Sequence, residues 1–251
     1  MKYIIYSIVL LLLIAQPFCT NTTSAQSNTE PVLIETYEAD VTGDGQSEVI
    51  ELRGILFSND TNYYREVWID ITSVHDEQWT ITYEGGYDPT IQFIDLDHDE
   101  VQDIFYQSAT GGSGGLYNYH LHTLKNEKVE EIPLPEQLHV RGKFMDDFNV
   151  EIQLSPDSEP NIVDVSSRSE EYIQLDIYND EGKLLEPTSV MIDPIAFFEP
   201  VLLSKSNGYG LKSYQQISGA YHADQLGTVE TLWYYENGDW IILQTEWVPS
   251  N

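Results

Sequence analysis

Two short acidic segments have the spacing of a metal-binding loop. In residues 40–48 and in residues 95–103, oxygen-bearing side chains stand at relative positions 1, 3, 5 and 9. Each segment lies between stretches with the pattern of β-strands, so the chain turns there and can bring those oxygens around one point. Ca²⁺ takes about six to eight oxygen ligands in flexible geometry. The spacing therefore predicts calcium binding, and by itself it does not indicate an enzyme.

The first loop (residues 40–48) has the glycines that sharp backbone reversals need, Gly43 and Gly45. Its predicted ligands are the side chains of Asp40, Thr42, Asp44 and Glu48 and the backbone carbonyl of Gln46. Asp and Gly are also common in turns that bind no metal, so an ordinary acidic turn is the alternative. Because Thr42 is a neutral ligand, we expect modest affinity.

The second loop (residues 95–103) carries more charge. Its predicted ligands are the side chains of Asp95, Asp97, Asp99 and Asp103 and the backbone carbonyl of Val101. Four carboxylates this close repel one another, and a divalent cation balances them. Glu100 stands where such loops usually have glycine, so we expect a strained or reshaped turn. Extracellular calcium modules bind at about 10⁻⁴–10⁻³ M, and we expect that range here.

The first 25 residues are typical of an export signal. Lys2 precedes an almost wholly apolar run, residues 3–15, which is shorter than the about 20 residues that span a bilayer. Thr23-Ser24-Ala25 offers a cleavage site, which makes residues 1–25 a signal peptide and residues 26–31 a flexible lead-in. The sequence therefore predicts a secreted protein, extracellular or associated with the cell envelope, with no membrane span.

Lipid attachment at Cys19, the only cysteine, is the alternative to cleavage after Ala25. A lipoprotein signal has a small residue just before the cysteine and usually Leu three residues before it. Phe18 and Gln16 stand at those positions, so the sequence favours cleavage. The mature chain would then contain no cysteine and no disulfide, so its fold has to be stabilised by a bound metal or by core packing.

The charge of the chain restricts its partners. There are 42 acidic and 11 basic residues, for a net charge of −31. Such a surface repels nucleic acid and anionic membranes, so we expect neither as a partner. It favours cations, basic proteins or envelope polymers, although a solvated acidic surface that serves solubility alone is the simpler interpretation.

The chain after residue 31 alternates apolar and polar residues with a period of two, which predicts an all-β fold. The alternating segments begin at Val67, Trp79, Leu116, Val150, Tyr172 and Thr231, and turn signals stand at Gly85-Gly86, Asp88-Pro89, Asp180-Glu-Gly182 and Asn237-Gly238. We expect one domain of antiparallel hairpin repeats, residues 32–251. The 55-residue step from Asp40 to Asp95 favours a propeller-like arrangement, with a two-sheet β-sandwich as the alternative.

Three further patterns are open to a chemical and to a structural interpretation. Residues 111–115, Gly-Gly-Ser-Gly-Gly, match a nucleophile elbow, but a period-two strand follows where an elbow needs a helix, so a glycine-rich hairpin is favoured. His120 and His122 share one face of a strand, as zinc ligands do, without an identifiable third ligand. The aromatic residues Trp233, Tyr234, Tyr235 and Trp240 suit a sugar-stacking platform or cross-strand packing.

The two loops resemble those of FG-GAP/VCBS-type calcium-binding β-repeats, and the wider chain resembles secreted proteins of spore-forming Gram-positive bacteria that contain them. The matching stretches are Asp40-Val-Thr-Gly-Asp-Gly, Gly85-Gly-Tyr-Asp-Pro, Phe93-Ile-Asp-Leu-Asp, Ser108-Ala-Thr-Gly-Gly-Ser-Gly-Gly-Leu-Tyr-Asn-Tyr and Tyr214-Gln-Gln-Ile-Ser-Gly-Ala-Tyr-His-Ala-Asp. The resemblance implies the same ligands in both loops. Residues 204–210 depart from the family, with Ser, Lys and Asn where a third acidic loop would stand. The resemblance implies an exported, calcium-stabilised β-protein and does not indicate any catalysed reaction.

Two functions are consistent with these observations. The first is a secreted, calcium-binding, non-catalytic β-repeat protein that acts at the cell surface or spore envelope through an unknown protein or envelope polymer. The second is an extracellular hydrolase or carbohydrate-binding module whose site is hidden among the many acids. The sequence favours the first.

Overall fold

The computed structural model describes residues 30–250, so the predicted signal peptide, Cys19 and most of the predicted lead-in lie outside the described residues. The first part of the chain forms one antiparallel sheet whose strands follow chain order. These strands are β1 (Val32–Ala39), β2 (Glu48–Leu56), β3 (Tyr63–Thr72), β4 (Gln78–Ile94), β5 (Asp103–Ala109), β6 (Tyr117–Thr123) and β7 (Glu130–Glu131). A short 3₁₀ turn, η1 (Lys125–Glu127), joins the last two.

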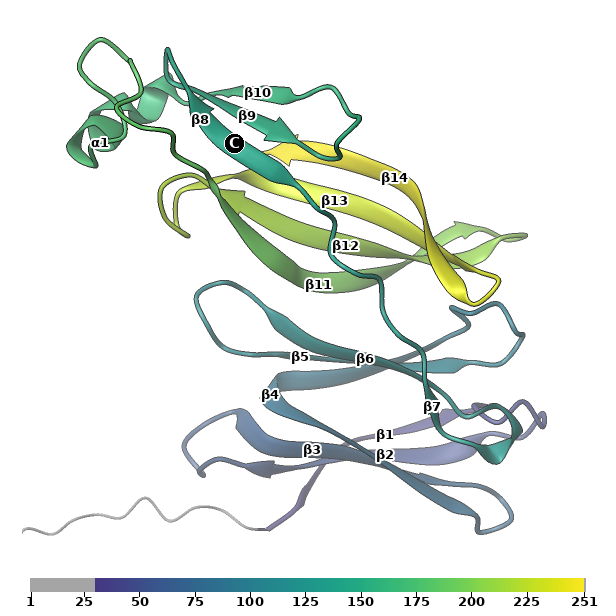
Figure 1. Ribbon diagram of the computed structural model, residues 1–251. Helices are drawn as coiled ribbons and strands as arrows, with labels where there is room; N and C mark the ends of the chain where they lie inside the picture. The colour runs from purple at the N-terminus through teal and green to yellow at the C-terminus, as the bar shows by residue number, and fades with distance from the viewer. Residues whose placement is uncertain (1–29, 251) are drawn as a thin grey trace, which may run out of the picture.

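Strand β4 folds this sheet into two layers. Its residues 78–87 pair with β3, and its residues 87–94 pair with β5, with a bulge between Tyr87 and Thr90. Because β4 changes partner halfway, β1–β3 and β5–β6 lie in separate layers that face each other (Figure 1). The predicted turns at Gly85-Gly86 and Asp88-Pro89 are therefore wrong, since both pairs lie inside one 17-residue strand.

The two glycines of β4 allow neighbouring strands to approach closely and do not form a turn. A Cβ on Gly85 would lie 2.3 Å from the carbonyl oxygen of Tyr64, and one on Gly86 would lie 2.4 Å from Ser108 Oγ. Any side chain there would push the neighbouring strands apart at the point where β4 leaves one partner for the other.

The second part of the chain forms two smaller antiparallel sheets. One has the order β10-β9-β8, and the other runs in chain order from β11 to β14. The strands are β8 (Arg141–Met145), β9 (Asn149–Gln153), β10 (Asn161–Asp164), β11 (Met191–Ser204), β12 (Gly208–Ser218), β13 (Gln225–Glu236) and β14 (Asp239–Pro249). The predicted Asn237-Gly238 hairpin is confirmed, with both residues in the left-handed region at φ 56° and 87°.

The strand predicted to begin at Tyr172 is wrong. The chain forms η2 (Ser166–Arg168) and then the short helix α1 (Ser169–Gln174). Tyr172 is completely buried, and its hydroxyl donates a 2.7 Å hydrogen bond to the buried carboxylate of Asp224. This long-range anchor fixes the segment, and the apolar alternation of residues 173–177 does not produce a strand.

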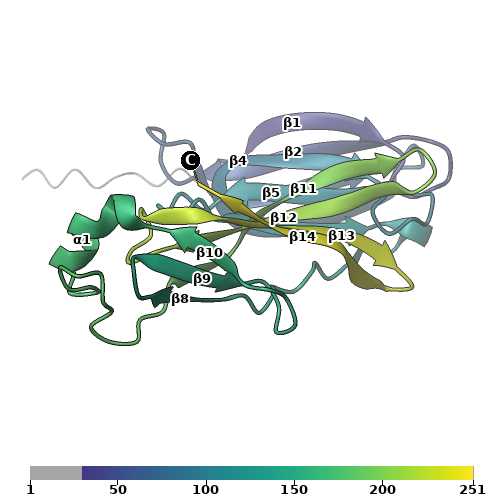
Figure 2. The ribbon, with the colours of Figure 1, turned by 90° about the horizontal axis from the view of Figure 1, so that it is seen from above.

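Three hydrophobic cores hold the layers together. The first core lies between β1–β3 and the β5 layer and includes Ile50, Ile69 and Tyr106. The middle core joins β5–β6 to β11–β13, and the last core joins β12–β13 to β8–β10 and α1. Strand β5 serves two cores, because Phe105 belongs to the middle core while Ile104 and Tyr106 belong to the first. The layers are stacked in this order in Figure 1, and Figure 2 looks down on the stack, where the layers overlap.

The predicted all-β class with antiparallel sheets is confirmed. Residues 30–250 form no closed barrel or propeller, and the stacked layers fit the sandwich alternative. The physical reason is the continuous β4, which ties the strands around both acidic loops into one folded sheet instead of two radial blades. Between residues 30 and 250, none of the helices has the length and apolar character needed to cross a membrane.

Candidate metal centre

The two acidic loops lie side by side at one end of the first two layers. The first loop connects β1 to β2, and the second connects β4 to β5. A Cβ on Gly43 of the first loop would come within 2.6 Å of a methyl group of Val101 in the second loop. The folding of β4 back over β3 brings together two segments that are 55 positions apart in the sequence.

Within the first loop, each carboxylate oxygen has a hydrogen-bond donor from the loop itself. The bonds run from the N–H groups of Gly43 and Gly45 to Asp40 (both 2.8 Å), from the backbone and side-chain N–H groups of Gln46 to Asp44 (2.7 and 3.3 Å), and from the Val41 N–H and the Thr42 hydroxyl to Glu48 (2.9 and 3.3 Å). Glu48 is completely buried. These bonds hold the loop in shape.

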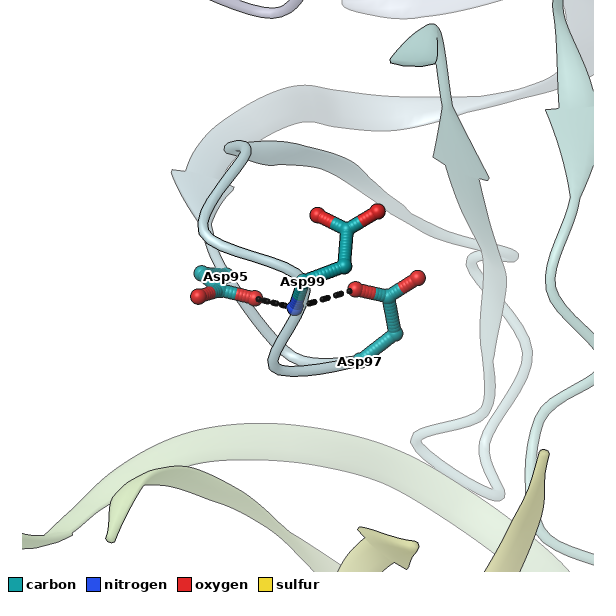
Figure 3. Close-up of side chains that lie close together, drawn as sticks. All are labelled: Asp95, Asp97 and Asp99. Carbon is teal, nitrogen blue, oxygen red and sulfur yellow. Dashed lines mark hydrogen bonds between the residues drawn. The ribbon is translucent and has the colours of Figure 1, made fainter. Parts of the chain in front are cut away.

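The second loop repeats this backbone arrangement with more carboxylates. The bonds run from the N–H groups of Asp99 and Glu100 to Asp95 (3.1 and 3.2 Å), from Asp99 to Asp97 (3.1 Å), from Val101 to Asp99 (2.9 Å), and from Leu96 and Asp97 to Asp103 (2.9 and 3.2 Å). One oxygen each from Asp95, Asp97 and Asp99 lies within 4.8 Å of the others (Figure 3). Elsewhere in residues 30–250, no other trio of His, Cys, Asp or Glu donors lies this close.

Asp103 leaves one buried oxygen without a partner. Its side chain is completely buried, its Oδ2 accepts the two N–H groups, and its Oδ1 has no hydrogen-bond donor among the described residues. Burial raises the pKa of Asp103 to about 7, and the charges of Asp97 and Asp99 act in the same direction. A buried carboxylate is costly unless a donor or a cation compensates it. Asp103 Oδ1 is therefore a candidate ligand atom of the second loop.

The second loop has one internal cation nearby. Lys125, in η1, places its ammonium group 3.0 Å from a carboxylate oxygen of Asp99 and 3.0 Å from the Asp99 backbone carbonyl. Burial raises the pKa of Asp97, and the charges of Asp99 and Asp95 add to this effect. One ammonium group therefore does not offset four carboxylates. No pattern within the loop signals Lys125, which lies 26 positions beyond Asp99.

The two loops share left-handed backbone at the same positions. Gly43 and Gly45 have φ values of 78° and 86°, and the equivalent His98 and Glu100 have φ values of 63° and 71°. For a residue other than glycine this conformation costs about 1–2 kcal/mol. The second loop thus keeps the geometry of the first without its glycines, at a cost in strain.

His98 connects the second loop to the β11–β14 sheet. Its ring stacks on Tyr234 with centroids 4.4 Å apart, and Gly208 lies against it.

The other aromatic residues of the predicted sugar-stacking platform lie in different surroundings. Trp233 is buried in the middle core and donates to Ser213 Oγ. Tyr235 and Trp240 meet edge to face at 5.1 Å. The four aromatic residues therefore do not form one exposed sugar-stacking surface.

The Gly-Gly-Ser-Gly-Gly segment belongs to the hairpin loop between β5 and β6. Strand β6 follows it directly, where a nucleophile elbow requires a helix. The hairpin alternative predicted from the sequence is confirmed, and Ser113 is exposed in that loop.

Comparisons with known proteins find a family model that matches the second half of the chain and a relative that aligns with most of it. Residues 138–248 match the family model described as the YybI C-terminal domain. The uncharacterized protein YybI of Bacillus subtilis (strain 168) is 28% identical over 211 residues, which are 80% of this chain and 78% of that protein. Among solved structures, rhamnogalacturonan lyase PL11 of Bacillus licheniformis is 16% identical with a TM-score of 0.35. That alignment covers 86% of this chain and about a third (34%) of the lyase.

Proposed function

We propose that this protein is a secreted, calcium-stabilised, non-catalytic β-protein and that the second loop is its principal calcium site. The partnerless Oδ1 of Asp103 is the observation that best supports this proposal. The same loop holds three carboxylates, those of Asp95, Asp97 and Asp99, whose oxygens lie within 4.8 Å of one another, and the charges of Asp97 and Asp99 act on Asp103. A divalent cation at this point compensates the buried charge and the mutual repulsion together.

The ligands favour Ca²⁺ over other cations. All the predicted donors are oxygens, which suit hard cations and not the soft ones that prefer thiolate or imidazole. Mg²⁺ requires a nearly ideal octahedral arrangement, whereas Ca²⁺ accepts the irregular geometry of a loop that supplies carboxylates and carbonyls. The first loop, with two carboxylates and Thr42 at the corresponding positions, is the weaker second site.

An extracellular location gives the calcium a defined role. Affinities of about 10⁻⁴–10⁻³ M fill the loops outside a cell and leave them empty inside it. With the export signal predicted for residues 1–25, calcium binding would link stability to export. The resemblance to FG-GAP/VCBS-type repeats agrees with this role. The acidic surface suits contacts with a basic protein or an envelope polymer at the cell surface or spore envelope.

Calorimetric titration with Ca²⁺, together with thermal unfolding, tests the proposal. At free Ca²⁺ 10 to 100 times the dissociation constant, linkage predicts about 1.4–2.7 kcal/mol of stabilisation per site. For a chain of this size that raises the Tm by about 3–10 °C. The double variant Asp97→Asn, Asp99→Asn should lose most of this rise, because it removes charge without changing side-chain volume.

The matched control is Asp40→Asn, Asp44→Asn in the first loop, which should lose less of the rise. If neither double variant changes the calcium response, the bound ions lie elsewhere on the acidic surface. If the wild-type protein shows no binding heat and no change in Tm at 10 mM Ca²⁺, the calcium proposal is wrong.

A further inference from the structure

A second group of metal-binding side chains lies on the opposite face of the β5–β6 layer from Asp103. His120 and His122 of β6 pair across the sheet with Tyr106 and Ile104, which belong to the first core. Alternate residues of a strand point to opposite faces, so the histidines share the face of Ile104, and the neighbouring Asp103 points away from it. The calcium loops do not use either histidine.

The structure supplies the further groups that the sequence did not identify for this histidine pair. His120 Nδ1 lies 3.0 Å from Glu131 Oε1 of β7, and His120 Nε2 lies 2.6 Å from Glu84 Oε2 of β4. An ionised carboxylate only accepts hydrogen bonds, and a neutral imidazole has a single N–H. Carboxylates at both ring nitrogens therefore require either an imidazolium or a metal ion in place of one proton.

His122 provides an independent sign of a ligand. Its side chain is 8% exposed, and its Nδ1 is buried without a hydrogen-bond partner among residues 30–250. Tyr83 is 7% exposed, and its hydroxyl is also buried without a partner in this part of the chain. The Tyr83 ring centroid is 5.7 Å from each histidine ring, so the two residues with unsatisfied groups pack against each other. Buried polar atoms without partners are rare in native proteins.

We propose that His120, His122 and Glu131 bind a transition-metal ion, with Zn²⁺ as the best fit. Two imidazole nitrogens and one carboxylate form the three-ligand set of an open zinc site. Two rings on one tetrahedral Zn²⁺, with Zn–N bonds of about 2.0–2.1 Å, have centroids about 5 Å apart. The His120 and His122 centroids are 6.0 Å apart, and the three donor atoms do not yet lie within 4.8 Å of one another, so metal binding requires both rings and the Glu131 carboxylate to turn toward one point.

The two carboxylates beside His120 have different roles in this site. Glu131 is the ladder partner of His122 and has a 60% exposed side chain, so its carboxylate can turn toward the ion. Glu84 stays on the far nitrogen of His120 and accepts its N–H. That contact is the carboxylate–histidine–metal arrangement that orients a ligand ring. Glu84 is therefore a positioning residue and not a ligand.

Zinc titration in 2 mM Ca²⁺ tests this site separately from the loops. We expect one Zn²⁺ equivalent per chain. Glu84→Gln should weaken zinc affinity about 10–100-fold, and His120→Gln and His122→Gln should each weaken it by more than that. Co²⁺ should give the visible absorption of a tetrahedral site, and Glu84→Gln should retain that spectrum at lower affinity. His75→Gln, at an exposed histidine of the β3–β4 turn, should bind as wild type does.

The outcomes separate this site from the proposed calcium loops. Zinc binding that persists in Asp97→Asn, Asp99→Asn and disappears in the histidine variants supports the proposal, whatever the calcium result. Zinc binding that disappears with the aspartate variants, or an octahedral Co²⁺ spectrum, would overturn it. Because His122 is buried, Glu131→Gln is the check that does not disturb the core, and unchanged zinc affinity in that variant would also overturn it.

Discussion

The two acidic loops have the same backbone arrangement but differ in how their carboxylates are satisfied. In both, the N–H of position 2 bonds the carboxylate of position 9 at 2.9 Å, and the N–H of position 7 bonds that of position 5. Positions 4 and 6 are left-handed in both. The backbone therefore does not distinguish them, and the difference lies in their side chains.

The loss of side-chain donors at two positions of the second loop explains that difference. At position 3 the first loop has Thr42, whose hydroxyl donates to the buried Glu48. The second loop has Asp97 there, and an ionised carboxylate has no hydrogen to donate to Asp103. At position 7, Gln46 donates to its loop's central carboxylate through its side chain, whereas Val101 cannot. The first loop thus satisfies its own carboxylates, and the second leaves Asp103 Oδ1 without a donor among residues 30–250.

The largest expected effect is the pH dependence of the calcium-free protein. The pKa of Asp103 is raised from 3.8 to about 7 in the folded state, mainly by burial. A group with a raised folded-state pKa contributes stability below its unfolded pKa and loses that contribution as the pH rises through the folded value. Stability in chelator should therefore fall between about pH 4 and 7, by at most about 4 kcal/mol.

Denaturant unfolding at several pH values, in EDTA and in saturating Ca²⁺, measures this effect. Calcium should replace the lost proton, so the stabilisation by calcium should increase toward pH 8. Asp103→Asn should flatten the EDTA profile, because its side chain does not ionise. A profile of the same slope in Asp103→Asn would show that the second loop is not the source of the pH dependence.

The next effect comes from exchanging the residues at position 3. Thr42→Asp should create in the first loop the unpaired buried carboxylate of the second, and Asp97→Thr should satisfy Asp103 with a hydroxyl. We expect the first variant to gain calcium stabilisation and the second to lose it, each by about 1–3 kcal/mol at saturating Ca²⁺. Thermal unfolding with and without 10 mM Ca²⁺ gives both values. Responses that do not change in opposite directions would refute the donor argument.

The sequence predicts what is local in this molecule. The loop spacing, the Asn237-Gly238 hairpin and the period-two strands depend on neighbouring residues, and the structure agrees with the hairpin and with most of those strands. The contact between Gly43 and Val101 depends on the path of β4, where Gly85-Gly86 has the composition of a turn. A glycine that permits close strand approach and a glycine that permits a turn look alike in a single sequence.

Contacts between distant segments could not be predicted from the sequence, because they depend on the path of the chain and not on neighbouring residues. Lys125 reaches Asp99 across 26 positions, and Glu84 reaches His120 across 36. Nothing in the local pattern selects these partners from 42 acidic residues. The histidine pair could be recognised from its spacing, whereas Glu131 and Glu84 could be assigned to it only once β4, β6 and β7 were placed.

The smallest expected effect tests whether the left-handed backbone that both loops share is more strained in the second loop than in the first. Glu100 and Gly45 occupy the same position with φ values of 71° and 86°. Glu100→Gly should stabilise the protein by about 1 kcal/mol. Glycine relieves the left-handed strain, and its greater conformational entropy in the unfolded chain offsets part of that stabilisation. Gly45→Ala should destabilise by about the same amount. A Cβ at Gly45 meets no atom within 4 Å, so that change reports conformation alone.

Equilibrium unfolding in EDTA at one pH measures both substitutions without calcium. Gly43→Ala is the contrasting control, because its Cβ would also collide with Val101 at 2.6 Å and should cost more than Gly45→Ala. Opposite signs for Glu100→Gly and Gly45→Ala would show that both loops adopt one backbone and that only the first has the residues suited to it. Equal signs would mean that the second loop relaxes its backbone when free of metal, and that the orphaned Asp103 oxygen is relieved by movement of the chain.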